Sequence, residues 1–275
     1  MTEKINIFWF RRDLRLEDNV GFHKALNGKL PVMPIFIFDS EILSKLPRND
    51  SRVTFIHDSL QAMRRKLLDH GSSLAIFQGK PLDIFKEILE KYAVQNVITN
   101  RDYEVYGQDR DKEIKNYLSS QSQDSKINND NGIGFYDYQD QVIFEKNNIV
   151  KDDGKPYVVY TPFKNKWKKR FNPREQLKNF ICSKYYANLY KNCELPNLSL
   201  ADIGFEKSSI EVPKYNVTPS IIQNYEDTRN FPAIDGTSHL GPHLRFGTVS
   251  IRRMVEKAIA EKNEIFWNEL IWREF

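Results

Sequence analysis

The sequence has little that would support a secreted, zinc-bound or membrane-spanning protein. Its two cysteines, Cys182 and Cys193, form neither a C-x-x-C pair nor a disulfide framework, which is typical of a reducing compartment. No apolar run approaches the ~18–20 residues that a membrane span needs. The apolar stretch Ile5–Phe10 is shorter than a signal-peptide core and is followed by no small-residue cleavage site. We therefore expect a cytoplasmic protein that has no membrane partner and binds no metal.

Glycine and proline are also scarce, at twelve each in 275 residues, which excludes a low-complexity chain. A hydrophobic content of 40% and a charged content of 28% are instead typical of a folded globular protein. The net charge of +4 is unevenly placed, because residues 151–275 hold the whole basic excess. A basic excess in one part of a chain is a weak indication of a polyanionic partner.

Apolar runs alternate with helical patterns over the first 140 residues. Such strands, apolar throughout and separated by helices, imply a parallel sheet covered on both faces. This pattern predicts a doubly wound, Rossmann-like α/β domain. The expected strands are Ile5–Phe10, Pro31–Phe38, Leu74–Phe77 and Val97–Thr99, and the expected helices are Asp18–Leu26, Arg48–Asp69, one from Pro81 and Gly107–Leu118.

The second half of the chain has a different pattern. Residues 119–134 are polar and rich in turn formers, which predicts a surface loop, and the β–α alternation is lost after Phe135. Helical patterns return from Pro219 onward, at 221–228, 250–261 and 264–275. We therefore expect an α/β domain over residues 1–135, an interdomain linker over 136–200 and an all-α domain over 201–275. The last helix is apolar and has no cap, so we expect this second domain to be incomplete.

The turn after the first strand lacks the glycine fingerprint of dinucleotide-binding folds, because it reads Arg11-Arg12-Asp13-Leu14-Arg15. A ligand can still bind at the carboxyl ends of parallel strands. In the alternative interpretation, the three arginines pair with Asp13, Glu17 and Asp18 on the surface.

Several enzyme motifs are incomplete around Gly236–Leu240. A G-x-S-x-G nucleophile elbow would need glycine at position 240, so we reject it. His239 and His243 have the spacing of a metal pair, but the intervening Gly241-Pro242 favours two solvent-facing or hydrogen-bonding histidines. Thr237 and Ser238 could present donors to a phosphate, or could simply cap a helix.

The final helix places a carboxylate and an indole one turn apart. Glu269 and Trp272 share a face, and Arg273 lies next to them. An indole can stack on a base, a carboxylate can bind its polar edge, and an arginine can hold a phosphate. The alternative is an ordinary core helix with an Arg–Glu pair. Likewise, the basic run 164–170 could contact nucleic acid or be a solvated face.

Five segments in order resemble the DNA photolyase/cryptochrome family. They are FWFRRDLRLEDN (residues 8–19), NRDYE with DRD (100–111), GKPYVVYTPF (154–163), TSHLGPHLRFG followed by Ser250 and Arg252 (237–252), and ELIWREF (269–275).

The resemblance implies an enzyme that splits cyclobutane pyrimidine dimers in damaged DNA, with light and reduced FAD as electron donor. It implies that the helical domain binds FAD and that the α/β domain holds an antenna chromophore, a reduced folate or a deazaflavin. At the positions that match the family's motifs, the expected FAD contacts are Tyr225, Thr237, Ser238, His239, Leu240, Gly241 and Phe266. The expected DNA contacts are Arg229, Glu269, Trp272 and Arg273, and Glu104 is the expected antenna contact if the chromophore is a reduced folate.

This sequence departs from the family pattern in two ways. Gly241 and His243 stand where the family commonly has serine and tyrosine, which removes a hydroxyl from the phosphate loop. Family members also continue further, and their electron-transfer tryptophan chain lies in that part, so no catalytic residue is assigned. We expect a monomeric fragment that binds FAD weakly or not at all and has impaired activity. A cryptochrome-like photoreceptor and a non-enzymatic chromophore-binding or nucleotide-binding module stay open, as does a (6-4) lesion.

Overall fold

The structure is a computed structural model that describes residues 3–121 and 132–275. Most of the predicted loop at 119–134 therefore lies outside the described residues. The chain forms two compact units, and we describe each by itself. The α/β unit comprises Met1–Tyr138 and Phe180–Val212, and the helical unit comprises Gln139–Asn179 and Pro213–Phe275. Among the described residues, no helix has both the length and the apolar character needed to span a bilayer.

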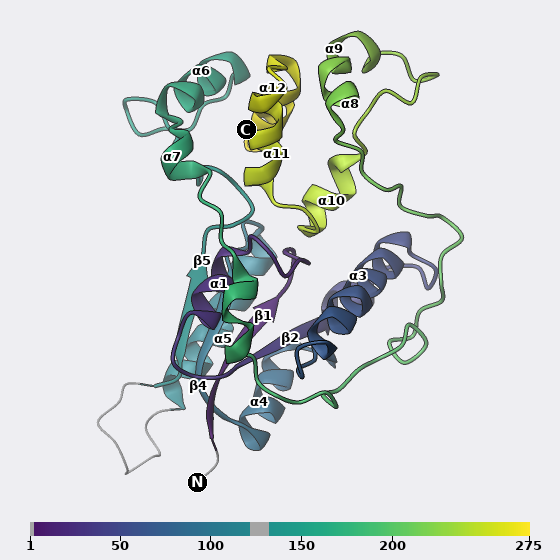
Figure 1. The fold of residues 1–275 in the computed structure, drawn as a ribbon. Coiled ribbons are helices and arrows are strands. Elements are labelled where there is room, and N and C mark those ends of the chain that lie inside the picture. Colours follow the sequence, from purple (N-terminus) through teal and green to yellow (C-terminus); the bar gives the residue numbers. More distant parts are fainter. Residues whose placement is uncertain (1–2, 122–131) are drawn as a thin grey trace. The chain divides into compact units, whose positions relative to one another are not determined.

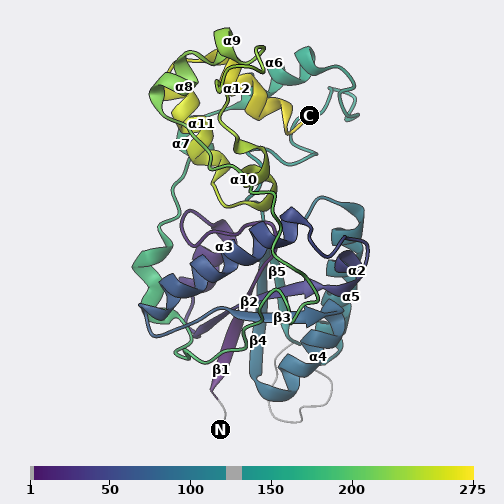
Figure 2. The same ribbon diagram turned by 90° about the vertical axis from the view of Figure 1, so that its right-hand side faces the viewer.

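The α/β unit is built on a five-stranded parallel sheet in the order β3-β2-β1-β4-β5 (Figure 1; β3 is labelled in Figure 2). The sheet confirms the predicted fold class and includes all four predicted strands. The strands are β1 (Lys4–Phe10), β2 (Val32–Asp39), β3 (Ala75–Gly79), β4 (Ala93–Asn100) and β5 (Gly134–Tyr138), and the helices are α1 (Val20–Leu26), α2 (Ser40–Leu43), α3 (Ser51–Leu68), α4 (Pro81–Lys91) and α5 (Val105–Ser120).

Both faces of the sheet are covered, because β1 and β2 are apolar and buried over nearly their whole length. On one face, Trp9 of β1 packs edge-on against Phe85 of α4, with ring centroids 5.2 Å apart. On the other face, Phe8 lies 5.1 Å from Phe22 of α1. Helices α3 and α4 flank the strands in both views of the ribbon (Figure 1 and Figure 2).

The fifth strand was not predicted. β5 extends the sheet by pairing with β4, from Gly134 beside Asn96 to Tyr138 beside Asn100. Its residues are only partly buried, as expected of an edge strand. A short, half-exposed segment such as GFYDY lacks the continuous apolar run that marks the central strands.

The segment predicted as a linker, residues 136–200, is divided between the two units. Its middle forms α6 (Tyr160–Arg170) and α7 (Pro173–Gln176) of the helical unit, with Trp167 only 1% exposed. Its end wraps the α/β unit, where the 3-10 helix Cys182–Asn188 lies and the Tyr190 amide donates to the Val32 carbonyl at 2.8 Å. Aromatic side chains that lack regular spacing are therefore core residues in both units.

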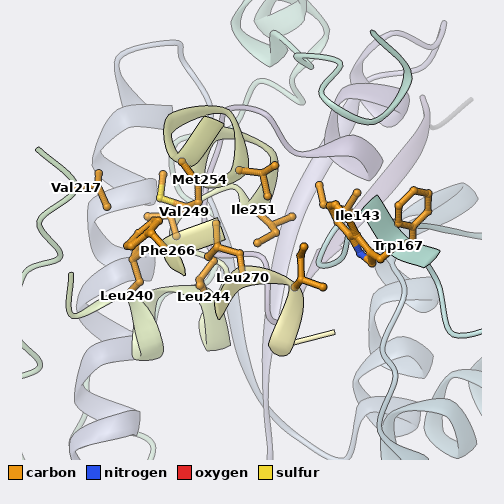
Figure 3. Close-up of a cluster of buried hydrophobic side chains, with 14 of the residues drawn as sticks. Ile143, Trp167, Val217, Leu240, Leu244, Val249, Ile251, Met254, Phe266 and Leu270 are labelled. Carbon is orange, nitrogen blue, oxygen red and sulfur yellow. The ribbon is translucent and has the colours of Figure 1, made fainter. Parts of the chain in front are cut away.

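The helical unit has a core of its own, shown in part in Figure 3. Helix α12 contributes Phe266, Leu270 and Ile271, each at most 5% exposed. The helix predicted at 221–228 is broken at Asn224 into two short helices. Besides α6 and α7, the helices of this unit are α8 (Pro219–Gln223), α9 (Tyr225–Thr228), α10 (Leu240–Phe246), α11 (Ile251–Ala260) and α12 (Glu264–Trp272).

Candidate functional site

The carboxyl ends of β1 and β4 in the α/β unit carry a buried polar network. The Asn100 amide donates to Asp13 Oδ2 at 2.6 Å and to Asn19 Oδ1 at 2.8 Å. Asn19 in turn caps α1 by accepting from the Phe22 amide at 3.0 Å. These bonds fix the loop after β1 without any glycine-rich turn.

Two arginines of this loop, Arg11 and Arg12, do not pair as the surface interpretation predicted, whereas the Arg15 guanidinium donates to the Asp18 carbonyl at 2.7 Å. Arg11 forms an ion pair with Asp111 of α5, and Arg12 reaches Asp102 at 3.4 Å and Glu104 at 3.1 Å. Pairing with Asp13, Glu17 and Asp18 is therefore wrong for Arg11 and Arg12. The reason is that parallel strands bring the loop after β4 and helix α5, which are 90 to 100 positions further along the chain, to the same edge of the sheet as the loop after β1.

Glu104, the expected antenna contact, lies at this edge. It precedes α5, and its side chain is 54% exposed although Arg12 holds it. Its carboxylate can thus reach a ligand at the carboxyl ends of the strands.

In the helical unit, α12 presents both expected lesion-binding side chains. The Trp272 indole is 49% exposed, so it is not a core residue. The Glu269 side chain is 41% exposed and forms an ion pair with Arg229, the residue that follows α9. That pair raises the pKa of Arg229, which keeps its guanidinium charged.

Tyr225 connects this pair to the core. Its ring packs edge-on against Phe266 at 5.2 Å, and the Arg229 guanidinium lies 5.7 Å from its centre. Burial, followed by the charge of Glu269, raises the pKa of Tyr225. The structure therefore brings together four of the expected site residues, with Phe266 on the buried side.

The expected phosphate loop precedes and begins α10. Thr237 is half-buried, Ser238 and Leu240 are buried, and Gly241 is exposed with open space where a side chain would begin. His239 has a left-handed backbone (φ 51°), and its Nε2 lies 2.8 Å from Asp235.

The two histidines of this segment are hydrogen-bonded, which is one of the two forms of the favoured interpretation. The solvent-facing form is wrong for His243, which is buried. His243 Nδ1 lies 2.8 Å from the Thr248 hydroxyl, and its Nε2 lies 3.0 Å from the Pro213 carbonyl. The part of the chain that the structure describes holds no cluster of three or more metal-binding side chains.

Arg273 and the basic run of α6 make contacts within the unit. Arg273 donates to the carbonyls of Gln141 at 2.7 Å and Leu244 at 3.3 Å. Lys166 and Lys168 pair with Asp152 and Glu264 at 2.8 and 2.7 Å. Both segments therefore have structural contacts, and their outer surfaces stay accessible.

A hollow of about 560 Å³ opens in the helical unit at the turn between α11 and α12. Neither Thr237 nor Ser238 lines it. Its lining is polar apart from one isoleucine and comprises Lys164, Gln223, Glu226, Glu261, Lys262, Asn263, Glu264, Ile265 and Asn268.

Two residues near the site were missed by sequence reasoning. Tyr160 at the start of α6 contacts Trp272, with ring centroids 4.0 Å apart. Glu274 accepts from the Trp167 indole at 2.7 Å, and burial raises its pKa to about 7. Both residues lie inside motifs that carried the family resemblance, but neither contact has a local sequence signal.

Known proteins resemble this chain along its whole length. A deoxyribodipyrimidine photo-lyase of Halobacterium salinarum is 29% identical over 98% of this chain and 60% of its own. A bacterial class III photolyase of Agrobacterium tumefaciens shares the fold, with a TM-score of 0.80 and 23% identity over 100% of this chain and 58% of its own. An archaeal photolyase of Sulfolobus tokodaii, solved with two FAD molecules, has a TM-score of 0.70 and 26% identity over 98% and 58%.

The chain thus spans about 60% of the length of these relatives. The family model described as DNA photolyase matches residues 6–180, which is more than half of the sequence. On this match, the chain belongs to the DNA photolyase family.

Proposed function

We propose that the protein acts in light-driven DNA repair and splits cyclobutane pyrimidine dimers by electron transfer from excited, reduced FAD. The observation that carries this proposal is the accessible pair on α12, Trp272 and Glu269, with Arg229 beside it. A dimer turned out of the duplex can stack on the indole while the carboxylate accepts from a base N–H group.

The charges of the pair suit this role. Arg229 forms an ion pair with Glu269 and thereby orients the carboxylate, whose oxygens can accept hydrogen bonds from a base. We propose that Arg229 and Arg273 also face the DNA phosphates. Because both arginines already have partners within the unit, their side chains are held in place before DNA binds.

The residues around the expected FAD site have chemistry that fits a phosphate and a ring system. Thr237 offers a half-buried hydroxyl, and the space beside Gly241 is open. When bound, FAD would supply the electron donor that light excites. We propose that Tyr225, Thr237, Ser238, His239, Leu240 and Gly241 contact it, with Phe266 supporting Tyr225 from the core.

We further propose that the α/β unit binds the antenna chromophore, a reduced folate or a deazaflavin, with Glu104 as one contact. The exposed carboxylate is suited to accept from the N–H groups of a pterin. In this proposal the α/β unit collects light, and the helical unit holds the cofactor and the lesion.

Binding of the 275-residue chain to two labelled oligonucleotides, one with a single thymine cyclobutane dimer and one undamaged, tests the repair role. We expect tighter binding to the dimer, and we expect Trp272→Leu to reduce this preference by about five- to a hundredfold, the value of one base–aromatic stack. Glu269→Gln should reduce it as well. Glu264→Gln, on the same helix but paired with Lys168, is the matched control and should have no effect.

Illumination after addition of reduced FAD then tests the reaction. We expect near-ultraviolet light to restore the undamaged bases only slowly, because FAD binding to this chain is expected to be weak. A nuclease that cuts only the repaired site measures the restored fraction. A chain that binds FAD but binds both oligonucleotides with equal affinity contradicts the repair function and favours a cryptochrome-like photoreceptor. Chromophore binding without FAD or DNA binding favours the non-enzymatic module.

A further inference from the structure

The ring of Tyr160 contacts the accessible indole of Trp272. The two rings lie nearly perpendicular, with centroids 4.0 Å apart and an angle of 89°. Such edge-to-face pairs are a favoured geometry between aromatic rings. Trp272 also stacks on Phe275 at 5.2 Å, so its indole is held from two directions while about half of it stays exposed.

The hydroxyl of the same tyrosine holds the backbone of α12. It donates to the carbonyl of Asn268 at 2.6 Å, one residue before Glu269. Burial, followed by the charge of Glu269, raises the pKa of Tyr160 to about 12, so the hydroxyl remains a donor at neutral pH. One side chain of α6 thus contacts both the indole and the turn of α12 that carries the carboxylate.

We propose that Tyr160 is a positioning residue for lesion binding, acting through Trp272 and Glu269; this inference rests on the proposed function. A half-exposed indole without a neighbouring ring would populate several rotamers, and binding would have to select one of them. Tyr160 reduces that cost by holding the indole in one orientation, and its hydroxyl fixes the helix turn beneath it.

The preference for dimer DNA over undamaged DNA measures this role. Tyr160→Leu should reduce the preference by about two- to tenfold, the value of one aromatic pair. Tyr160→Phe keeps the aromatic ring but loses the hydroxyl, so its preference for dimer DNA should lie between those of wild type and Tyr160→Leu. Tyr157→Leu is the matched control, because Tyr157 is in the same segment but packs against Phe163 at 6.3 Å.

The orientation of the indole can be measured without DNA. Labelling with 5-fluorotryptophan gives four ¹⁹F resonances, and Trp272→Phe assigns one of them. Tyr160→Leu should shift or broaden the Trp272 resonance, while those of Trp9 and Trp167, both 1% exposed, stay in place and show that each unit is folded. An unchanged Trp272 resonance overturns the inference.

The two proposals fail in different ways. A wild-type chain that binds both oligonucleotides equally contradicts the proposed function. A wild-type chain that prefers the dimer, with the preference unchanged in Tyr160→Leu, leaves that function in place and overturns the role of Tyr160.

Discussion

The Glu274 carboxylate accepts a hydrogen bond from the Trp167 indole at 2.7 Å and thereby joins the end of α12 to α6. It also accepts from the backbone amides of Ile143 and Phe144. Three donors from two other segments converge on one carboxyl group. The end of the helix that carries Glu269 and Trp272 is therefore fixed from within the helical unit.

This contact predicts a pH dependence of stability. Burial raises the pKa of Glu274 to about 7 in the folded chain, whereas an unfolded glutamate titrates near its ordinary value of ~4.3. Between these values the folded state binds more protons than the unfolded state. The contribution of this group to the free energy of unfolding should therefore decrease as pH rises from about 4.5 to 7, by at most ~1.4 kcal/mol per pH unit.

Denaturant unfolding at pH 5 and pH 7.5 measures the effect. Tryptophan fluorescence reports mainly on the helical unit, which holds three of the four tryptophans. The stability of wild type relative to Glu274→Gln should be lower at pH 7.5 than at pH 5. Glu264→Gln is the control, because Lys168 lowers the pKa of Glu264 and its contribution is constant over this interval. If the free energy of unfolding of wild type, relative to that of Glu274→Gln, increased from pH 5 to pH 7.5, the expectation would be contradicted.

A second prediction concerns the buried ion pair of Asp140 and Arg252. The two side chains are 0% and 7% exposed and lie 3.0 Å apart. Asp140→Asn removes a carboxylate that lies 3.0 Å from this buried guanidinium, so we expect it to lower the free energy of unfolding by about 3–5 kcal/mol. Asp152→Asn breaks an exposed pair with Lys166 and should cost ~0–1 kcal/mol. Similar losses for both variants in urea unfolding would argue against this distinction.

The sequence predicted the sheet well because β1 and β2 are buried on both faces, and such strands are read as continuous apolar runs. It did not predict the partners of Arg11 and Arg12, because these lie after β4 and in α5, and their position beside β1 depends on strand order. Nor could it place Trp272: α12 reads EIFWNELIW, apolar on nearly every side, and only packing shows that this indole is accessible while Phe266 is buried.

The antenna proposal gives a third prediction. Glu104→Gln removes the charge of the exposed carboxylate at the end of β4 and should weaken binding of a reduced folate by about five- to a hundredfold. Glu87→Gln, on the surface of α4, is the control and should leave the affinity unchanged. Fluorescence titration of the folate measures both. Equal affinity of wild type and Glu104→Gln would exclude Glu104 as a contact.

The last prediction concerns Gly241, where this sequence lacks the serine common in its family. A Cβ atom at this position would meet no heavy atom within 4 Å, and the backbone of Gly241 is not among those with positive φ. Gly241→Ser should therefore fold without strain and present an exposed hydroxyl in the first turn of α10. One added neutral hydrogen bond to the FAD phosphate would tighten binding by about two- to tenfold. Gly241→Ala fills the same space without a donor, so its FAD affinity, measured by flavin fluorescence, should stay near that of wild type. If serine and alanine have equal effects, the loop does not contact the phosphate through this position.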